Sequence, residues 1–209
     1  MRSFRHWTPR YVVDRIAIAR FQRLDPAAPW LTPRAVEFLD RMLLPDDRGL
    51  EFGSGRSTVW LARRIGHLVS VEDDAGWHER VSRQLKELSL DNVDYRFAPR
   101  DLPEDRGGDS EYARSVLELP DASLNLVLVD GAYRDHCARY ALPKLAPGGL
   151  LVIDNVNWFL PSQTRSPFSR GPADGPATPA WAEVLSIIGG WRTVWTSCGV
   201  WDTAIYLKP

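Results

Sequence analysis

One short stretch of the chain combines glycines with a carboxylate where an apolar run gives way to a helical pattern. It reads GLEFGSGRST from Gly49 to Thr58, with Glu51 just ahead of Gly53 and Gly55. Glycines at a strand-to-helix turn allow a tight bend and let the backbone approach a ligand closely. The loop has neither the Gly-Lys-Ser/Thr ending of a phosphate-binding loop nor the third glycine of the dinucleotide fingerprint. We therefore expect a ligand other than a phosphate chain.

The acids beside this loop indicate the chemistry of that ligand. Glu51 would repel a pyrophosphate, but a carboxylate at this place suits a ligand that carries an amino group. Glu72 ends the next apolar run, HLVSVE, at the place where doubly wound folds bind ribose hydroxyls. The two acids together predict a nucleoside with an amino-acid tail, a description that fits S-adenosylmethionine.

A second set of polar residues follows two strongly apolar runs, LNLVLVD and GLLVID. Asp130 closes the first run, Asp154 closes the second, and Asn155 comes next. If the two runs are neighbouring parallel strands, these side chains meet at one edge of the sheet. Carboxylate and amide oxygens are hard ligands that suit Mg²⁺ or Ca²⁺ rather than Zn²⁺. The set can hold such a cation, or the two acids can cap loops and contact substrate without one.

The periodicity around these residues predicts strands that alternate with helices. Apolar runs typical of strands cover 50–52, 67–72, 93–97, 124–130 and 149–154, and helical spacing covers 57–65, 77–88, 135–145 and 181–188. Residues 191–197 and 203–208 are expected to form an antiparallel pair. This alternation predicts an α/β fold with a doubly wound, Rossmann-like parallel sheet.

Two further segments flank this pattern. We expect N-terminal helices over 9–24 and 33–42, the first burying Val13, Ala17, Phe21 and Leu24, and the second burying Ala35, Phe38, Leu39 and Met42. Residues 155–180 are rich in proline and glycine, which predicts either a lid over the site or a disordered insertion. The chain is interpreted as one domain, 1–209, with a helical cover over 1–46 and the α/β core over 47–209.

Composition narrows the class of protein. With 209 residues, a formal charge of −1 and two cysteines, the sequence favours a globular protein of the reducing cytoplasm and gives no sign of a signal peptide or membrane span. The overall charge argues against a dedicated nucleic-acid binder. One local basic cluster near the N-terminus is expected to be a solvated helix surface, with an RNA or acidic-partner site as the alternative; it consists of Arg2, Arg5, Arg10, Arg15, Arg20 and Arg23.

Four motifs in order resemble class I S-adenosylmethionine-dependent methyltransferases. LEFGSGRST is similar to the first motif of the family, SVED to the second, and LVLVDG and LAPGGLLVIDN to those of the fourth and fifth strands. The resemblance covers about Gly49 to Asn155 and implies a seven-stranded sheet with an antiparallel last strand. It also implies donor contacts, with the adenine near Ala98 or Asp101. The expected donor-site residues are Glu51, Gly53, Ser54, Gly55, Ser57, Thr58, Glu72, Asp73, Asp101 and Asp130.

The pair of acids followed by asparagine is similar to the metal-binding set of catechol-type O-methyltransferases, which implies Mg²⁺ at Asp130, Asp154 and Asn155. That family places a lysine base three residues after the first aspartate, and here the position is Tyr133, followed by Arg134. Tyr133, Arg134 and His136 are the candidates to replace it, with Asp130 as the fourth catalytic candidate. An unperturbed histidine would suit proton removal near neutral pH, although His136 is equally compatible with a surface position on its helix.

The leading interpretation is transfer of a methyl group from S-adenosylmethionine to a small-molecule acceptor, with O-methylation ahead of N-methylation and with or without a cation. An RNA or protein acceptor is the first alternative, supported only by the N-terminal arginines. A non-catalytic nucleoside-binding module of the same fold is the second. A homodimer is compatible with the sequence, which has no signature of oligomeric state.

Overall fold

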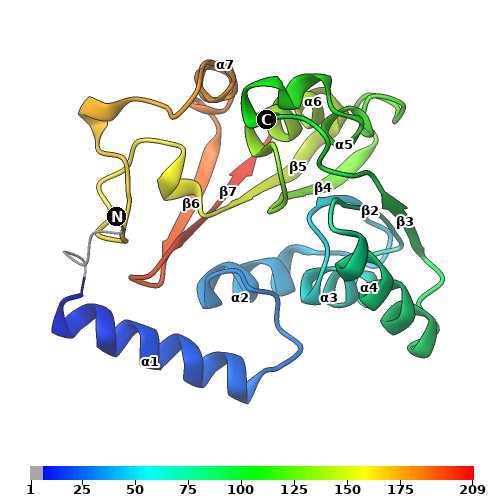
Figure 1. The fold of residues 1–209 in the computed structure, drawn as a ribbon, viewed down its shortest axis with the longest axis horizontal. Helices are drawn as coiled ribbons and strands as arrows, with labels where there is room; N and C mark the ends of the chain where they lie inside the picture. Colours follow the sequence, from blue (N-terminus) through cyan, green and yellow to red (C-terminus); the bar gives the residue numbers. More distant parts are fainter. Residues whose placement is uncertain (1–6) are drawn as a thin grey trace.

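The centre of the protein is a seven-stranded sheet, in a computed structural model that describes residues 7–209. Its strands lie in the order β3-β2-β1-β4-β5-β7-β6 (Figure 1). The pairs formed among β1 to β5 are all parallel, whereas β7 runs antiparallel to both β5 and β6. The predicted doubly wound sheet with an antiparallel last strand is therefore confirmed. The strands are β1 Arg48–Phe52, β2 His67–Glu72, β3 Val93–Phe97, β4 Leu124–Val129, β5 Leu145–Asp154, β6 Arg192–Ser197 and β7 Asp202–Leu207.

The helices begin where the sequence supplies caps. Thr8, Asp74 and Thr178 each accept a backbone N–H of the helix that follows, and a proline stands in the first turn of the helices after Thr8 and Thr178. The α-helices are α1 Pro9–Leu24, α2 Pro33–Met42, α3 Arg56–Ala62, α4 Ala75–Glu87, α5 Glu111–Arg114, α6 Arg134–Ala141 and α7 Pro179–Ile188. Short 3-10 turns are η2 Glu104–Asp109, η3 Leu142–Lys144, η4 Val156–Trp158 and η5 Pro172–Asp174.

The sheet is buried on both faces, which explains its almost continuous apolar strands. Along β4, Leu126 and Leu128 face an apolar cluster with α2 and α3, whereas Val127 and Val129 face the larger cluster with α5, α6 and α7. Alternate side chains along the strand therefore pack into two separate apolar layers, one on each face of the sheet. This sandwich fixes the carboxyl ends of β1, β2, β4 and β5 at one edge, where the motif residues lie.

Helix α1 has the predicted bounds but not the predicted buried stripe. Its only buried side chain is Ile18, while Val13 and Leu24 are 64% and 74% exposed. The error arises because α1 is a peripheral helix (Figure 1), so helical spacing of apolar residues did not translate into burial. The four described arginines of the basic cluster, at positions 10, 15, 20 and 23, are exposed, and Arg2 and Arg5 lie outside the described residues. Helix α2 buries Ala35 and Leu39 as expected, but Met42 is exposed.

The proline- and glycine-rich segment 155–180 is held to the sheet by specific hydrogen bonds. The Asn157 side chain donates to the Pro167 carbonyl, and its Oδ1 accepts the backbone N–H of Asp202 in β7. Ser166 Oγ donates to Asp202 Oδ1 at 2.6 Å. The segment thus follows a defined path beside the sheet. No helix formed by residues 7–209 is both long and apolar enough to cross a membrane.

Candidate functional site

The glycine turn between β1 and α3 packs directly against the loop after β4. Gly53 has φ +89°, and a Cβ at this position would lie 2.6 Å from the Gly131 backbone nitrogen. No side chain fits that space, because the contact is with backbone that cannot move aside. The turn therefore brings the two loops at the carboxyl ends of β1 and β4 into contact, as a cradle for a ligand requires.

Glu72 anchors this turn from the neighbouring strand β2. Its Oε2 accepts hydrogen bonds from the Ser54 backbone N–H at 2.8 Å and the Ser54 hydroxyl at 2.6 Å. Its Oε1 accepts the backbone N–H groups of Asp73 and Asp74 at 3.0 and 2.9 Å. Glu72 thus orders both loops around the predicted donor site. We expected ribose hydroxyls as its partners, and the structure instead gives both of its oxygens to backbone and serine donors.

Two aromatic residues that the sequence analysis missed complete the support of the loop. The Tyr95 hydroxyl lies 2.7 Å from Ser54 Oγ, and Trp77 Nε1 donates to the Ser54 carbonyl at 2.7 Å. Tyr95 belongs to β3, which was expected only as the strand 93–97, and Trp77 was expected only as the first residue of the helical pattern 77–88. Only the position of Tyr95 in β3, next to β2, could have indicated its role.

Glu51 lies beneath the glycine turn and is fully buried. Its Oε2 accepts hydrogen bonds from Thr58 Oγ1 at 2.6 Å and Ser70 Oγ at 2.7 Å, and Thr58 Oγ1 in turn accepts the Gly55 N–H at 2.8 Å. Glu51 Oε1 has no hydrogen-bond partner within residues 7–209. Burial raises the pKa of Glu51 to about 7, against the lowering effect of its hydroxyl donors.

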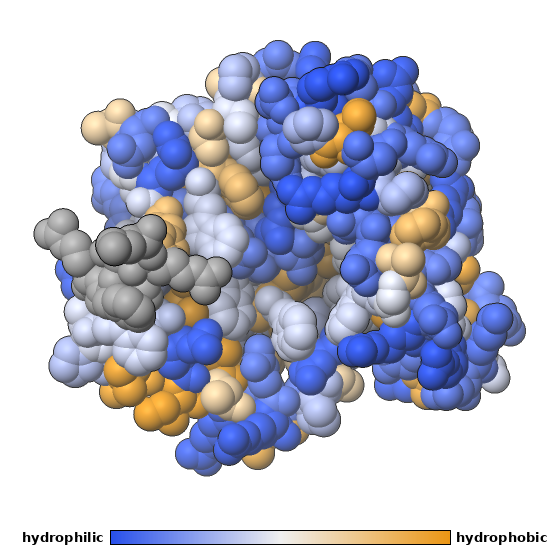
Figure 2. All heavy atoms as spheres, viewed as in Figure 1, coloured by the Kyte–Doolittle hydropathy of each residue, from blue (hydrophilic) through white to orange (hydrophobic). Residues whose placement is uncertain are grey.

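A cavity of about 750 Å³ opens above the glycine turn. Besides the turn, its lining includes Trp30, Arg56, Glu72, Asp73, Trp77, Arg80, Asp130 and Gly131. The molecular surface is hollowed near its centre in this view (Figure 2). Ser57 lines the cavity as predicted, whereas Thr58 is fully buried and supports the turn from below. The volume is within the range of small-molecule and cofactor sites.

Arg56 is a lining residue that the sequence analysis overlooked. Its guanidinium packs over the Trp30 ring, 5.4 Å from the centroid. Its Nη1 is buried and has no hydrogen-bond partner among the residues that the structure describes. A buried cationic donor without an acceptor is costly unless a ligand supplies one. Arg56 therefore indicates an anionic group in the ligand of this cavity.

A second cavity of about 500 Å³ adjoins the first and shares Asp73 and Gly131 with it. Its wall includes aromatic rings from segment 155–180 and α7, among them Phe159 stacked on Trp181 with centroids 5.3 Å apart. By contrast, Ala98 and Asp101 line a separate cavity of about 710 Å³ between β3 and α5. The structure does not bring Asp101 to the glycine turn, because the chain after β3 leads to α5 rather than back over the turn.

The two strand-end acids are neighbours, as their spacing predicted. Val129 pairs with Ile153 in the sheet, so Asp130 and Asp154 follow at adjacent positions. Asp154 Oδ1 accepts the Thr203 hydroxyl at 2.6 Å. Burial raises the pKa of Asp154 well above its usual range, and the Asp130 carboxylate adds to the effect. Burial also raises the pKa of Asp130, whereas the charge of Arg134 lowers it.

The guanidinium of Arg134 lies against the Asp130 carboxylate, the main-chain carbonyl of Asp154 and the side chain of Asn155. Its Nη2 lies 2.9 Å from Asp130 Oδ1 and donates to the Asp130 carbonyl at 2.6 Å. Its Nη1 donates to the Asp154 carbonyl at 2.7 Å and to Asn155 Oδ1 at 3.2 Å, and its Nε donates to the Gly131 carbonyl at 3.0 Å. Arg134 thus binds the residues predicted to hold a cation.

This arrangement does not fit the expected Mg²⁺ site. The Asp130 carboxylate and the Asn155 side-chain oxygen are engaged by Arg134, and Asp154 Oδ1 is engaged by Thr203. Within the described chain, no group of three or more His, Cys, Asp or Glu side chains is arranged to hold a metal ion. Arg134 was a candidate base in the sequence, whereas its side chain turns back onto the Asp130 carboxylate and the loops after β4 and β5.

Of the other two candidate bases, Tyr133 lines the 500 Å³ cavity that adjoins the glycine turn, and His136 lines neither of the two cavities. The Tyr133 hydroxyl donates to the Leu102 carbonyl and accepts the Leu102 N–H, so it ties down the loop after β3. The His136 ring packs against Gly108 and Tyr140 and lines neither of the two adjoining cavities. The Tyr133 hydroxyl is thus engaged by the Leu102 backbone, and the position of His136 does not support the role predicted for it as a base. Asp130 does line the donor cavity.

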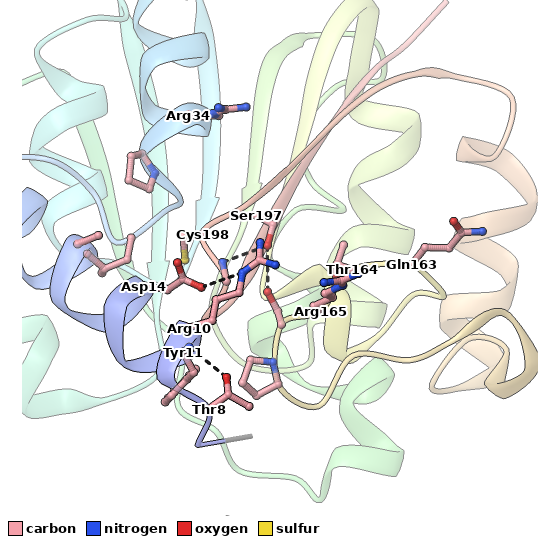
Figure 3. Close-up of a pocket in the computed structure, with 16 residues that line it drawn as sticks. Thr8, Arg10, Tyr11, Asp14, Arg34, Gln163, Thr164, Arg165, Ser197 and Cys198 are labelled. Atoms are coloured by element: carbon pink, nitrogen blue, oxygen red, sulfur yellow. Dashed lines mark hydrogen bonds and ion pairs between the residues drawn. The ribbon is translucent and has the colours of Figure 1, made fainter. Parts of the chain in front are cut away.

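A larger cavity of about 1180 Å³ lies between α1, the start of α2, residues 163–167 and the β6–β7 turn. Figure 3 shows Arg10 and Asp14 of α1 facing Thr164 and Arg165 across it. It shares no lining residue with the cavity above the glycine turn. We therefore assign the chemistry to the smaller cavities, which contain the motif residues.

Comparisons with known proteins agree with this geometry. A family model described as a methyltransferase domain matches residues 50–156. A methyltransferase-like protein from Silicibacter pomeroyi is 23% identical, with a TM-score of 0.57 over 88% of this chain and 90% of that chain. A protein from Staphylococcus aureus assigned as a caffeoyl-CoA O-methyltransferase is 15% identical, with a TM-score of 0.56 over 98% of this chain and 94% of that one. A Geobacter sulfurreducens methyltransferase is 16% identical, with a TM-score of 0.56 over 94% and 89%.

The glycine turn, the acid at the end of β2 and the antiparallel last strand define a class I methyltransferase. The chain belongs to this S-adenosylmethionine-dependent methyltransferase family, and its donor is S-adenosylmethionine.

Proposed function

We propose that the protein transfers the methyl group of S-adenosylmethionine to an oxygen of a small-molecule acceptor. The observation that carries this proposal is the 750 Å³ cavity, which combines the close-packed Gly53 turn with an unpartnered Arg56 donor. The formal charge of −1 supports a small molecule over RNA as the acceptor. The similarity in fold to a protein assigned as an O-methyltransferase supports oxygen as the nucleophile.

The donor is proposed to span both adjoining cavities. Its amino-acid tail would lie over the glycine turn, with the carboxylate bound by Arg56 and the amino group above the buried carboxyl group of Glu51. Its ribose would lie near Glu72 and Asp73. The adenine would then enter the 500 Å³ cavity across the shared wall formed by Asp73 and Gly131.

The reaction is an in-line displacement. The acceptor oxygen forms a bond to the methyl carbon while the carbon–sulfur bond breaks, and the electron pair of that bond neutralises the sulfonium charge. The acceptor hydroxyl also loses a proton, and Asp130 is the proposed recipient because it lines the cavity and burial raises its pKa. Alignment of oxygen, carbon and sulfur can supply roughly 7–11 kcal/mol of such a barrier.

Calorimetry with S-adenosylhomocysteine and with adenosine tests this donor pose. Arg56→Gln should weaken the binding of S-adenosylhomocysteine about tenfold, which corresponds to the loss of one charge-assisted hydrogen bond. The affinity for adenosine should be unchanged, because adenosine has no carboxylate. Arg80→Gln is the matched control, because Arg80 lines the same cavity and stacks on Trp77 at its exposed rim. An equal loss of affinity for both ligands would contradict the proposed contact between Arg56 and the donor carboxylate.

A methyl-transfer screen with small hydroxylated and aminated acceptors tests the rest of the proposal. Failure of S-adenosylmethionine and S-adenosylhomocysteine to bind would reject it outright. The alternative of an RNA acceptor rests on the exposed arginines of α1. It predicts RNA binding that weakens with salt and is lost on deletion of residues 2–23.

A further inference from the structure

The Arg134 guanidinium uses all of its hydrogen-bonding capacity inside the site. A guanidinium has five N–H donors. The structure gives it contacts to five oxygens: three backbone carbonyls at 131, 130 and 154, the Asp130 carboxylate and the Asn155 amide. Their distances lie between 2.6 and 3.2 Å. No donor is left to contact an acceptor molecule, so Arg134 is built into the site rather than aimed at substrate.

The surroundings hold this side chain in place. Arg134 is only 16% exposed, and its guanidinium packs 5.7 Å from the centroid of Phe159 in segment 155–180. The residues on either side of the contact, Tyr133 and Asn155, have left-handed backbones with φ +45° and +51°. Such a conformation costs roughly 1–3 kcal/mol for a non-glycine residue and persists where surrounding contacts over-determine it. The turn at Asn155 places its side-chain oxygen against the guanidinium.

We propose that Arg134 is the resident cation of this site, occupying the place between Asp130, Asp154 and Asn155 that a divalent ion would otherwise take, so that donor binding and methyl transfer require no metal. The inference deepens the proposed function and rests on it for the statement about methyl transfer. A divalent ion and the guanidinium cannot share the site, because they would compete for the same oxygens and repel each other.

The proposal makes Arg134 a positioning residue. It fixes the Asp130 carboxylate at the wall of the donor cavity and joins the loops that follow β4 and β5. A single positive charge also leaves less electrostatic attraction for an acceptor oxyanion than a divalent ion would. The site is therefore expected to favour acceptors with one hydroxyl, which need no chelation by two adjacent oxygens.

Titration of the full-length protein with Mn²⁺, followed by the electron paramagnetic resonance signal of free Mn²⁺, tests this inference without a substrate. Wild-type protein should take up no Mn²⁺ at concentrations up to the order of 1 mM, at which protein sites of ordinary affinity for divalent ions are occupied. Arg134→Ala should expose the oxygens of Asp130, Asp154 and Asn155 and bind one Mn²⁺ per chain. Adding Asp130→Asn to that variant should abolish the binding.

Arg139→Ala is the matched control, because Arg139 lies on the same helix and pairs with Glu183 at the surface at 2.7 Å. It should behave as wild type. Arg134→Lys keeps the charge and should also bind no Mn²⁺, which separates exclusion by charge from damage to the fold. Mn²⁺ uptake by wild-type protein that Asp130→Asn removes would overturn the proposal, as would a folded Arg134→Ala that gains no site.

Calorimetry with S-adenosylhomocysteine on the same samples, with and without EDTA, separates the two proposals. Unchanged donor affinity in EDTA is expected. A loss of affinity in EDTA would overturn the metal-independent site while leaving the donor assignment intact. Absence of donor binding in both buffers would instead reject the proposed function, and the Mn²⁺ result would still decide what occupies the acid pair.

Discussion

Glu51 provides the sharpest physical prediction, because it is an acid buried beneath the donor loop. We consider Glu51→Gln, which keeps the shape of the side chain and one oxygen to accept the Thr58 and Ser70 hydroxyls. The substitution removes the ability to ionise, and the NH2 group that replaces the other oxygen does not titrate, so its effect is the same at every pH. Comparing the two proteins as a function of pH therefore isolates the free energy of placing a carboxylate at this position.

The sign follows from the two pKa values. The pKa of Glu51 rises from 4.5 to about 7 on folding because burial penalises the charged form. The folded state then holds the proton more tightly than the unfolded chain, so the contribution to stability is complete below pH 4.5 and is lost as the pH rises to about 7. When this linkage is integrated between pH ~5 and ~8, the free energy of unfolding of wild type falls by about 2.5 kcal/mol relative to that of Glu51→Gln.

Thermal unfolding at several pH values measures this difference. For a chain of this size, about 2.5 kcal/mol corresponds to roughly 5–10 °C in Tm. The Tm of wild type minus that of Glu51→Gln should therefore fall by this amount from pH ~5 to ~8. A difference that stays constant over this range would show that Glu51 ionises normally, and the account of an unpaired buried oxygen beneath the loop would be wrong.

Three further predictions concern the loops and the acid pair. Gly53→Ala should abolish S-adenosylhomocysteine binding because its Cβ would meet backbone at 2.6 Å, whereas Gly148→Ala, with a similar φ of +79° in open space, should cost only about 1 kcal/mol of stability and keep binding. Glu72→Gln should weaken donor binding at least ~10-fold in calorimetry, since an amide nitrogen cannot accept the loop N–H groups. Thr203→Val should lower the free energy of unfolding by about 1–3 kcal/mol in urea denaturation, because the buried Asp154 loses its hydrogen-bond donor. An unchanged free energy of unfolding would mean that the hydrogen bond from Thr203 to Asp154 contributes nothing to stability.

The order of strands and helices could be predicted because it depends on local pattern. Strands 67–72 and 93–97 were predicted to the residue, since apolar runs bounded by polar residues have few other interpretations. Helix α1 shows the limit of that reasoning. Its spacing predicted a buried stripe, but burial depends on what lies beside a helix, and little of the protein packs against its outer side.

Some features of the candidate site follow from local sequence, and others depend on which segments the fold brings together. The glycine turn and the strand-end acids follow from the sequence, because a strand-to-helix turn and the carboxyl edge of a parallel sheet are defined by short segments. The partners of Glu72 and the part played by Tyr95 came only from the neighbouring strands. Sequence spacing says nothing about which donors a buried carboxylate finds across a sheet.

The sequence by itself determined the family, the donor and the edge of the sheet where chemistry occurs, since these depend on residue types in order along the chain. Only the tertiary structure decided what occupies the acid pair. Arg134 is four residues from Asp130 but twenty-one from Asn155, and it joins them only because β4 and β5 are neighbours in register. Whether a long side chain points to solvent or turns back onto a carboxylate and the loop carbonyls beside it is a property of packing, which no local pattern records.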